Sequence, residues 1–417
     1  MSKDMDSIKN IFKLAMIGCG GYAGYLIDRL AELPKVCELL AVTTPDPDDP
    51  SAQACREKGL PVYNSADELL DNISPETCDA VLIPTSIDSH YEYARMAVEH
   101  GFHVLLEKPP VATIQDLDRL IELQRESGKF IAVNFQHLYS DATQQLKHRL
   151  GRGEFGAIRC VKGHALWQRP EYYFSRSFWS GRLQIDGKWV LDGTIGNPLA
   201  HLMAEALYLA SPAPGMANPV RVQAELYHAN DIESEDTSVV RLETEKDVPV
   251  FFCASLCGDE MPPILCEIET DQATIRLHDH RHAEIHYRDG REEVLGNLEP
   301  NEQTDRNLMI KSVCRALLRH ERPMITVEEC RPYMLAWNGA FESAGQPAAI
   351  AFDRKESEHG TMRVIDGIKE LSQKAFREQQ TFSELGIDWA MPGAPVDLSG
   401  YGHFPSLNPV LMDRELV

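Results

Sequence analysis

The chain contains no stretch that approaches the ~20 consecutive apolar residues of a membrane helix. Its first ten residues, MSKDMDSIKN, lack the basic-then-apolar pattern of a secretory signal. It also has no run of basic residues, and 41 basic against 64 acidic residues give a formal net charge of −23. A nucleic-acid backbone would be repelled by that charge. We therefore expect a cytoplasmic protein with neither a membrane nor a nucleic-acid partner.

Cysteine is present but has no motif. The ten cysteines are scattered along 417 residues without a CxxC pair, and the nearest approach to one is Cys253 with Cys257. This pattern favours reduced, mostly buried thiols over a disulfide framework. The length and the 43% hydrophobic content allow two domains with full cores.

A glycine-rich turn follows directly after a short apolar run near the N-terminus. Residues 13–17 read KLAMI, and the next segment is Gly18-Cys19-Gly20-Gly21-Tyr22-Ala23, before a helical pattern. This is G-x-G-x-x-A between a strand and a helix, the context that the dinucleotide-binding motif requires. The first glycine permits the tight turn, the second lets the backbone approach a pyrophosphate, and the small alanine allows close packing. The start of the helix offers unpaired N–H groups to the phosphates.

Strands and helices alternate through the first 140 residues. Further strands are predicted at 39–42, 80–83 and 103–106, with helical stretches around 66–72 and 91–100. Such alternation indicates parallel pairing and a doubly wound α/β sheet. Packing alone could also explain a single glycine turn, but the continued alternation favours a nucleotide-binding domain.

The end of the second strand is where such folds bind the adenosine ribose. The chain reads Thr43-Thr44-Pro45-Asp46-Pro47-Asp48-Asp49 here, with no acidic residue at the strand end and no basic residue beside it. Thr44 and Asp46 are the candidate ribose contacts. Three aspartates would discourage an additional 2′-phosphate, so NAD is favoured and NADP remains possible.

The third and fourth strands end in segments that resemble a known family. Pro84 and Thr85 follow the third strand with His90 beyond them, and Glu107-Lys108-Pro109 follows the fourth. In this order, after the glycine turn, the motifs resemble the Gfo/Idh/MocA family, named for glucose–fructose oxidoreductase and inositol dehydrogenase. The resemblance covers residues 12–345. It implies cofactor contacts by Gly18, Gly20, Gly21, Tyr22, Ala23, Thr44, Asp46, Pro84, Thr85, His90, Glu107 and Lys108.

Lys108 lies where open α/β sheets bind their ligands, at the carboxyl end of a strand. Pro109 disfavours helical geometry at Lys108. An ammonium group here can polarise a substrate hydroxyl or carbonyl oxygen while a nicotinamide exchanges hydride. The alternative is a surface lysine that pairs with Glu107. For His90 a packing or capping role is favoured over catalysis.

The later half reads as antiparallel strands after a helix at 141–150. The strands are expected at 158–165, 220–227, 237–243, 250–257, 264–269 and 273–277. The resemblance places them in one large, mostly antiparallel open sheet whose outer face often forms subunit contacts. The expected domains are 1–138 (Rossmann), 139–355 (α+β, substrate and oligomerisation) and 356–417, a C-terminal helix over 361–378 with an aromatic, proline-rich tail. The tail is expected to pack on the domains or on a neighbouring subunit.

A second catalytic segment is Asp192-Gly193-Thr194-Ile195-Gly196-Asn197-Pro198-Leu199-Ala200-His201. The resemblance implies an Asp or Asn four residues before a histidine at a helix start, and Asn197 and His201 have that spacing, which would place both on one helical face. A histidine can take the hydroxyl proton as hydride leaves. Asn197 would orient the substrate or the lysine. The alternative for His201 is a helix cap against the core.

The stretch 167–189 is unusually aromatic. It holds seven aromatic residues where the chain average of 8% predicts about two, and Arg169, Arg176, Arg182 and Lys188 are interleaved with them. Aromatic faces suit the C–H faces of a sugar, and cations suit a carboxylate or phosphate. Packing against the sheet or a subunit neighbour is an equal alternative. Arg176 and Lys188 join Lys108, Asn197 and His201 as candidate substrate contacts.

The segment 276–286 contains a tempting metal pattern. Strand periodicity would place four histidines (His278, His280, His282 and His286) and Glu284 on one face. Asp279 and Arg281 would then point to the opposite, otherwise apolar face, so a solvated strand edge or turn is favoured and no metal is expected.

These features predict an NAD(P)-dependent oxidoreductase that moves hydride to or from a secondary alcohol of a sugar, cyclic polyol or sugar derivative. Lys108 and His201 would manage the hydroxyl proton, and Asn197 would position the reacting groups. One alternative is a tightly bound NAD used for transient oxidation in elimination or glycoside cleavage. Another is a non-catalytic nucleotide-binding sensor. A homodimer or homotetramer through the second-domain sheet is expected.

Overall fold

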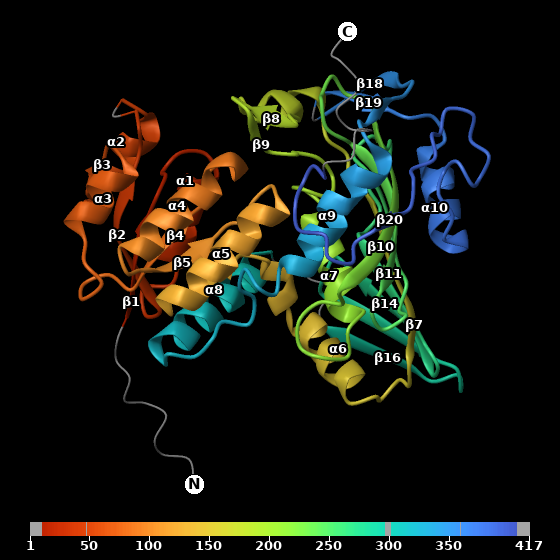
Figure 1. The fold of residues 1–417 in the computed structure, drawn as a ribbon, viewed down its shortest axis with the longest axis horizontal. Helices are drawn as coiled ribbons and strands as arrows, with labels where there is room; N and C mark the ends of the chain where they lie inside the picture. The colour runs from red at the N-terminus through yellow and green to blue at the C-terminus, as the bar shows by residue number, and fades with distance from the viewer. Residues whose placement is uncertain (1–10, 47, 297–301, 359, 407–417) are drawn as a thin grey trace. The chain divides into compact units, whose positions relative to one another are not determined.

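The computed structural model describes residues 11–46, 48–296, 302–358 and 360–406, and within them the chain forms two compact units. Unit 1 comprises residues 1–110, 119–134 and 302–328, and unit 2 comprises 111–118, 135–301 and 329–417. This division differs from the expected domains in three respects: residues 111–118 lie in unit 2, residues 302–328 lie in unit 1, and the C-terminal part expected as a third domain belongs to unit 2. The helix α8 (Glu302–Leu318) belongs to unit 1, although it follows the strands of unit 2 along the chain (Figure 1).

Unit 1 is built on a six-stranded parallel sheet in the described part of the chain, with strand order β3-β2-β1-β4-β5-β6. This is the doubly wound Rossmann order, and it confirms the predicted fold of the N-terminal domain. The strands are β1 (Phe12–Met16), β2 (Cys37–Thr43), β3 (Val62–Tyr63), β4 (Ala80–Ile83), β5 (His103–Leu106) and β6 (Ile131–Val133). Its helices include α1 (Tyr22–Ala31), α2 (Pro50–Glu57), α3 (Ala66–Asn72), α4 (Ile87–Glu99) and α8, while α5 (Ile114–Ser127) spans the boundary between the units.

The sequence explains these elements locally. All four residues of β4 are buried, which is the continuous apolar run expected of a strand covered on both faces. On α1 the buried residues Ala23, Leu26, Ile27 and Leu30 recur at helical spacing and form one apolar stripe. The hydroxyl of Ser65 accepts a hydrogen bond from the N–H of Glu68 and so caps the start of α3.

Unit 2 contains a 10-stranded mixed sheet among its described residues. Its order is β16-β15-β14-β13-β7-β12-β11-β10-β17, with β20 beside β10, and most neighbours are antiparallel. The large, mostly antiparallel sheet is therefore confirmed, with parallel pairs at β7–β12 and β10–β17. The strands are β7 (Ile158–Leu166), β10 (Pro219–His228), β11 (Thr237–Thr244), β12 (Val250–Ser255), β13 (Leu265–Thr270), β14 (Ala273–His278), β15 (His282–Tyr287), β16 (Glu292–Gly296), β17 (Ala348–Ala349) and β20 (Val396–Asp397).

Shorter elements and helices complete unit 2. Two small hairpins are β8 (Gln184–Ile185) with β9 (Lys188–Trp189), and β18 (Asp353–Ser357) with β19 (Gly360–Val364). The helices are η1 (Gln136–Tyr139), α6 (Asp141–Gly151), η2 (Glu171–Ser175), α7 (Ala200–Leu209), α9 (Arg331–Ala344) and α10 (Ile368–Glu378).

Helices cover both faces of this sheet, as neighbouring residues of β7 show. Gly163 faces Leu202 of α7, whereas the ring of His164 packs on Phe376 of α10. Successive side chains of a strand point to opposite faces. Helix α7 therefore covers one face of the sheet, and α10 covers the opposite face, called the outer face below, as Figure 1 shows.

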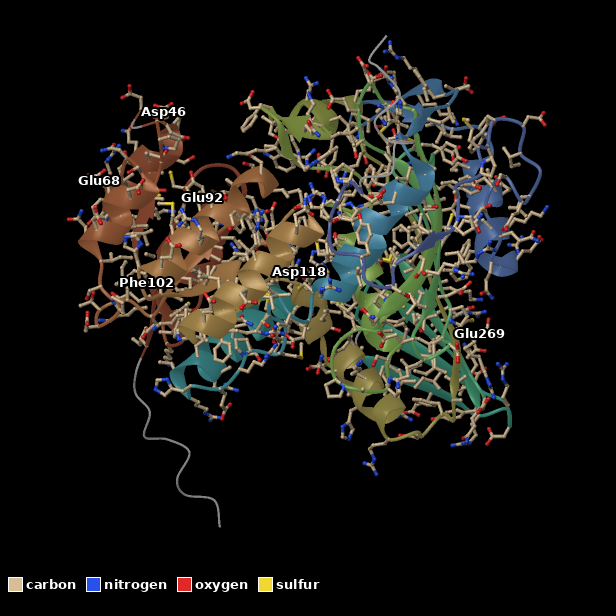
Figure 2. The ribbon with its side chains drawn as sticks, in the orientation of Figure 1. Asp46, Glu68, Glu92, Phe102, Asp118 and Glu269 are labelled. Carbon is tan, nitrogen blue, oxygen red and sulfur yellow. The ribbon has the colours of Figure 1, made fainter. Side chains whose placement is uncertain are left out.

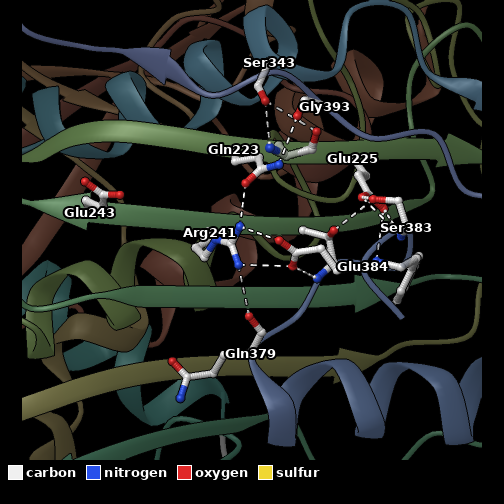
Figure 3. Close-up of polar contacts among 12 residues, drawn as sticks. Gln223, Glu225, Arg241, Glu243, Ser343, Gln379, Ser383, Glu384 and Gly393 are labelled. Carbon is white, nitrogen blue, oxygen red and sulfur yellow. Dashed lines mark hydrogen bonds and ion pairs between the residues drawn. The ribbon is translucent and has the colours of Figure 1, made fainter. Parts of the chain in front are cut away.

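The C-terminal segment after α10 also packs on the outer face of the sheet. Phe382, Leu385, Ile387 and Trp389 pack on an apolar cluster that includes Tyr227. Around it, the guanidinium of Arg241 donates to both carboxylate oxygens of Glu384 at 2.8 and 3.1 Å, and the buried Glu225 accepts from the N–H of Phe382 at 3.1 Å (Figure 3). The tail thus packs on its own unit's sheet.

One expected element differs in the structure. Residues 361–378 do not form one helix, because β19 occupies Gly360–Val364 and α10 begins only at Ile368. Gly367 separates the two with a φ of +67°, a backbone conformation that interrupts a helix. The histidine segment contains the expected strand end and turn: β14 ends at His278, β15 begins at His282, and Asp279 and His280 lie in the turn with φ of +46° and +65°. No described helix of either unit is long and apolar enough to cross a membrane.

Candidate functional site

The glycine turn of unit 1 joins β1 to α1 in the manner that the motif predicts. Gly18 has a φ of +111°, which favours glycine, and its N–H donates to the hydroxyl of Thr43 at 3.0 Å. A Cβ on Gly18 would lie 3.7 Å from that of Ala23 and 3.6 Å from Cγ2 of Thr85. The turn therefore packs closely on the first turn of α1 and on the loop after β4.

The acidic group beside this turn is Asp49 rather than Asp46. A Cβ on Gly20 would lie 3.2 Å from Oδ2 of Asp49, whose other oxygen accepts from the N–H of Ser51 at 2.7 Å and caps α2. Asp46 is exposed on the loop before α2 (Figure 2). Thr44 is buried and its hydroxyl donates to the carbonyl of Asp46 at 3.1 Å. Sequence reasoning noted all three aspartates, but which of them reaches the turn depends on the path of the loop.

The segment after β4 holds the segment after β5 in place. The ring nitrogens of the buried His90, in the first turn of α4, lie 2.9 Å from the carbonyl oxygen of Pro109 and 3.1 Å from that of Thr85. Burial lowers the pKa of His90, while the carbonyl oxygens oppose the shift. The predicted packing role of His90 agrees with these contacts, because the ring ties Pro109 to Thr85. Pro84, the residue before Thr85, is also buried.

Glu107 and Lys108 stand at the carboxyl end of β5. Glu107 is 6% exposed, and its Oε1 accepts from the amide of Asn134 at 2.9 Å. Burial raises the pKa of the Glu107 carboxyl, against the lowering by Asn134, Lys108 and Arg306. Lys108 is half-buried, and its own N–H donates to Glu107 at 3.3 Å. Glu107 thus anchors the backbone from which the lysine projects.

Arg306 of α8 is a polar residue of unit 1 that sequence reasoning missed. It is 4% exposed, and its guanidinium donates to the hydroxyls of Tyr22 at 3.0 Å and Tyr25 at 2.8 Å. Tyr22 is the first residue of α1, directly after the glycine turn. Only the return of α8 to unit 1 brings Arg306 to this place, and the local sequence of α8 carries no signal for it.

These residues of unit 1 fit a dinucleotide. The loops after β1, β4 and β5 end neighbouring parallel strands at one edge of the sheet. Gly20 leaves space that a side chain would fill, α1 begins at Tyr22 with its N–H groups towards the turn, and the carboxylate of Asp49 lies beside Gly20.

The second candidate segment lies in unit 2, where Asp192 organises it. Asn197 donates from its side-chain amide to Oδ1 of Asp192 at 2.7 Å, and Oδ2 accepts from the N–H of Gly181 at 2.7 Å. Helix α7 begins at Ala200, so Asn197 lies in the turn before the helix. The expectation that Asn197 and His201 share a helical face is therefore wrong. Residues 193–199, including Pro198, form turns, and the helix begins only after them. The buried Asp192, rather than helix geometry, orients Asn197.

His201 lies in the first turn of α7 and is 9% exposed. Its ring meets the ring of Phe135 edge-on at 5.7 Å between centroids and that of His137 at 4.7 Å. A third ring, from His280, lies 6.5 Å away. His201 is thus held among aromatic rings of unit 2, in the first turn of α7.

Glu235 supports the backbone that leads to Asn197. It is fully buried, and its Oε1 accepts from the N–H of Ile195 at 3.1 Å and the hydroxyl of Thr194 at 3.2 Å. A Cβ on Gly193 would overlap the Glu235 carboxyl, so glycine is required there. Burial raises the pKa of Glu235 to about 7.

The aromatic loop 167–189 places one of its two candidate cations beside Asp192. Nη2 of Arg176 lies 3.5 Å from Oδ2 of Asp192, and its guanidinium stacks on Tyr173 at 3.8 Å and on Trp179 at 5.0 Å. Arg176 and Asn197 therefore share one carboxylate. Lys188, by contrast, is exposed on β9 of the small hairpin. The structure joins Arg176 to the Asn197 segment, and the role of Lys188 stays a prediction.

The histidine cluster divides between two environments. His278, His282 and His286 each have a ring nitrogen 3.6–3.9 Å from a carboxylate oxygen of Glu284 on the outer face of the sheet. His280 is buried, with Nδ1 2.8 Å from Glu205. The expected solvated edge is therefore wrong for His280, because the turn directs it into the core, and for His282, which is 8% exposed. Within residues 11–46, 48–296, 302–358 and 360–406, no group of three or more histidines, cysteines or carboxylates is arranged to hold a metal ion.

Comparison with known proteins supports the interpretation of unit 1 as a dinucleotide-binding domain. Residues 12–135 match the model of a family described as an oxidoreductase family with an NAD-binding Rossmann fold. The chain is similar to the D-glucoside 3-dehydrogenase of Escherichia coli, with 31% identity over 37% of this chain and 43% of that protein. It is similar to inositol 2-dehydrogenase 3 of Saccharopolyspora erythraea, with 26% identity over 64% of this chain and 73% of that one. The chain spans about half the length of the first two curated relatives it matches.

Solved structures share the fold over most of the chain. The WlbA dehydrogenase of Bordetella pertussis in complex with NADH and UDP-GlcNAcA has a TM-score of 0.65 and 21% identity over 79% of this chain and 97% of that one. A levoglucosan dehydrogenase in complex with NADH has a TM-score of 0.70 and 15% identity, over 85% and 100%. At these identities the likeness establishes the two-part fold.

Proposed function

We propose that this chain is a member of the Gfo/Idh/MocA family of oxidoreductases with an NAD-binding Rossmann domain, and that it transfers hydride between NAD and a secondary alcohol of a sugar, cyclic polyol or sugar derivative. One observation carries the proposal: Lys108 projects from the carboxyl end of β5, the neighbour of β4, on the edge of the sheet where β1 ends in the glycine turn. A cation at this edge is suited to an oxygen of the substrate.

NAD would supply the acceptor or donor of the hydride. Gly18, Gly20 and the start of α1 would hold its pyrophosphate, and Asp49 the adenosine ribose. Lys108 would polarise the reacting oxygen, so that the hydroxyl becomes more acidic or the carbonyl more electrophilic. Glu107 is fixed by Asn134 and therefore holds the lysine backbone rather than the substrate.

In unit 2 we assign the proton transfer to His201. As the hydride leaves the carbon, the hydroxyl proton passes to the imidazole, which returns it in the reverse direction. Asn197 would orient the substrate, because its amide nitrogen is bound to Asp192 and its carbonyl oxygen is directed by that bond.

The aromatic loop supports a sugar-like substrate. Tyr172 and Phe178 are 64% and 72% exposed, and such faces stack on the C–H faces of a pyranose or cyclitol. Arg176 already faces the Asp192 carboxylate, which offsets its charge. A neutral sugar or polyol therefore suits this loop better than a dianionic one.

The test begins with the purified full chain. We expect NADH to bind more tightly than NADPH in fluorescence titrations, and a screen of polyols, sugars and uronic acids to give an absorbance change at the nicotinamide band. Lys108→Met and His201→Asn should each lower kcat by about 10²-fold or more with nucleotide affinity retained. The matched control Lys35→Met, at an exposed lysine of unit 1, should be unchanged.

The possible outcomes separate the rival functions. Binding without turnover would favour a sensor, while substrate conversion without net cofactor reduction would favour a retained NAD. Absence of nucleotide binding would overturn the proposal.

We also propose a cytoplasmic homo-oligomer. All ten cysteines are buried free thiols, which suits a reducing compartment. The outer face over β7, β12, β11 and β10 is covered by the C-terminal segment, so a contact between subunits through the sheet would use the face of β13 to β16. Light scattering of the intact protein, compared with that of a Val294→Glu variant at this 59% exposed residue, tests the contact.

A further inference from the structure

A buried group of polar side chains surrounds His201 in unit 2, and the proposed chemistry does not use most of it. His280, at the tip of the β14–β15 hairpin, is 5% exposed, and its Nδ1 lies 2.8 Å from Oε2 of Glu205. Glu205 is fully buried and stands four residues after His201 on α7. Residues four apart on a helix lie on the same face, so the carboxylate and His201 point towards the same side of α7.

His137 connects this pair to His201. Its ring stacks on that of His280 with centroids 4.3 Å apart and planes 13° from parallel. The same ring of His137 meets His201 edge-on, at 4.7 Å and 79°. The four side chains therefore form a continuous row from Glu205 through His280 and His137 to His201, and each is less than 10% exposed.

Neighbouring elements hold the row in place. The hydroxyl of Thr143 on α6 donates to Oε1 of Glu205 at 3.0 Å. The hydroxyl of Ser140 donates to the carbonyl of His280 at 2.6 Å, which anchors the hairpin tip. Asp279 and His280 both have positive φ, a conformation that costs about 1 kcal/mol or more for residues other than glycine. A strained turn that buries an imidazole against a carboxylate indicates that the contact is specific.

We propose that Glu205 and His280 are positioning residues which, through His137, orient the ring of His201 and raise its affinity for a proton. The inference rests on the proposed role of His201 as the proton-transfer group. A buried carboxylate favours imidazolium nearby. Stacked rings disfavour two adjacent positive charges, so His280 and His137 together should carry at most one positive charge. The row thus takes up protons as a coupled unit with one compensating anion.

Two other titratable groups of unit 2, Cys266 and Tyr333, lie near this row. Cys266 on β13 faces Glu205, and burial together with that carboxylate raises its pKa well above the usual range, so it remains a neutral thiol. Tyr333 on α9 packs on Phe135, and its hydroxyl donates to the carbonyl of Ile195 at 2.8 Å. Neither of these groups supplies a charge that could replace Glu205.

The experiment uses the full chain with 13C-labelled histidine, and the His201 signal is assigned by its absence in His201→Gln. In Glu205→Gln we expect the His201 titration midpoint to fall by about one pH unit or more. The acidic limb of kcat/KM for alcohol oxidation should move down by the same amount, with a plateau lowered about threefold because the base is weaker. KM should change little.

Matched variants separate this role from a structural one. Glu284→Gln removes a carboxylate with histidine neighbours from the same hairpin on the opposite face, and it should leave the His201 titration unchanged. Thr143→Val removes a hydrogen bond of Glu205 but keeps its charge, so it should give a smaller shift. If Glu205→Gln does not fold, His280→Gln serves instead, because its amide can still donate to Glu205, and it should move the midpoint in the same direction.

An unmoved His201 midpoint in folded Glu205→Gln and His280→Gln, with only a lower stability, would overturn the inference. The signal is read without substrate, so it is independent of the proposed reaction. If His201→Gln retained full turnover, the proposed function would fail, whereas the titration would still decide whether Glu205 controls the proton affinity of His201.

Discussion

At the scale of single residues, we expect two carboxyl groups, those of Asp49 and Glu235, to affect cofactor preference and stability, whereas exposed acids should not. Asp49 lies beside Gly20, whereas Asp46 is exposed nearby on the same loop. Glu235 is enclosed by the segment that leads to Asn197, whereas Glu243 is exposed on β11. All four residues are carboxylic acids, so only their surroundings distinguish them.

Asp49→Asn should increase the affinity for NADPH relative to NADH. The asparagine still caps α2, because its side-chain oxygen accepts from the N–H of Ser51, but the negative charge that repels a 2′-phosphate is removed. We expect the ratio of the two dissociation constants, measured by fluorescence titration, to shift about tenfold towards NADPH. Asp46→Asn is the matched control and should leave the ratio within about twofold. Equal shifts in both variants would show that Asp49 does not face the ribose.

Glu235 should make the protein less stable as the pH rises towards 7. Burial raises the folded-state pKa of its carboxyl from the ordinary value of 4.5 to about 7, so the folded state binds more protons between these values. The free energy of unfolding therefore falls through this window and is level above it, by about 3 kcal/mol in total from this group. Relative to the wild type, Glu235→Gln should gain that amount between about pH 4.5 and about pH 7.

Urea unfolding across this pH range measures the difference. Glu243→Gln, the same change at an exposed carboxylate, should show no such pH dependence. A constant difference between Glu235→Gln and the wild type at all pH values would mean that Glu235 ionises like an exposed acid.

At the scale of elements, the helix that carries His201 is stabilised at its far end by a lysine from a different helix. Nζ of Lys147 on α6 donates to the carbonyls of Tyr208, Ser211 and Gly215 at 2.5, 2.7 and 2.8 Å. These groups lie at and beyond the end of α7, where carbonyls lack helical partners. Burial lowers the pKa of Lys147 to about 7, while the partial negative charge of the helix end favours the ammonium.

Lys147→Met should destabilise unit 2 by about 2–4 kcal/mol, because one buried and two half-buried carbonyls lose a donor at once. Thermal unfolding measures the loss. The control is Lys374→Met at an exposed position of α10, which should change the free energy of unfolding by less than about 0.5 kcal/mol. An equally small effect at Lys147 would indicate that water replaces the ammonium.

The C-terminal segment forms a second element contact, between the outer face of the sheet and Phe382. This ring is fully buried and lies 6.0 Å from Tyr227 and 5.6 Å from Trp389. Phe382→Ala should cost about 3–5 kcal/mol and expose apolar surface, seen as a lower unfolding temperature and increased binding of a hydrophobic dye. Phe178→Ala, at a 72% exposed ring, is the matched control. Dye binding that does not rise in Phe382→Ala would contradict the packing of the tail.

At the scale of the whole molecule, the formal net charge of −23 acts on every part of the chain. Like charges repel, and the compact state concentrates them, so net charge far from zero destabilises folding. Most ion pairs of the described residues are at least partly exposed, and such pairs contribute little each. Self-repulsion should therefore dominate the response to salt.

The unfolding temperature should rise with added salt near neutral pH. Raising the ionic strength from about 0.01 M to about 0.3 M shortens the screening length several-fold. If screening recovers about 1 kcal/mol, the midpoint rises by about 2–4 °C. Choline chloride should match sodium chloride, which separates screening from the binding of a particular cation. A midpoint that falls with salt would show that ion pairs outweigh the net repulsion.

The chain's local patterns were sufficient for the Rossmann half. The apolar strands, the glycine turn and the Glu107-Lys108-Pro109 segment are contiguous signals, since each depends on neighbours in sequence. They predicted the parallel sheet, the placement of Lys108 at a strand end and the cofactor class. In unit 2 the alternation of apolar and polar residues predicted antiparallel strands, and the family resemblance predicted that they form one large sheet. These features follow from periodicity and turn chemistry, which the chain carries locally.

Contacts between distant segments were decided only by the tertiary structure. Arg306 reaches Tyr22 across 284 residues, and Glu225 binds the backbone at Phe382 across 157. His280 reads locally as part of an exposed strand, but a turn with positive φ directs it to Glu205. The amino-acid sequence thus determined the fold class, the glycine turn and the candidate catalytic side chains. The tertiary structure decided which aspartate lies beside the turn, which carboxylate orients Asn197 and which residues surround His201, because packing between remote elements leaves no period or motif in the chain.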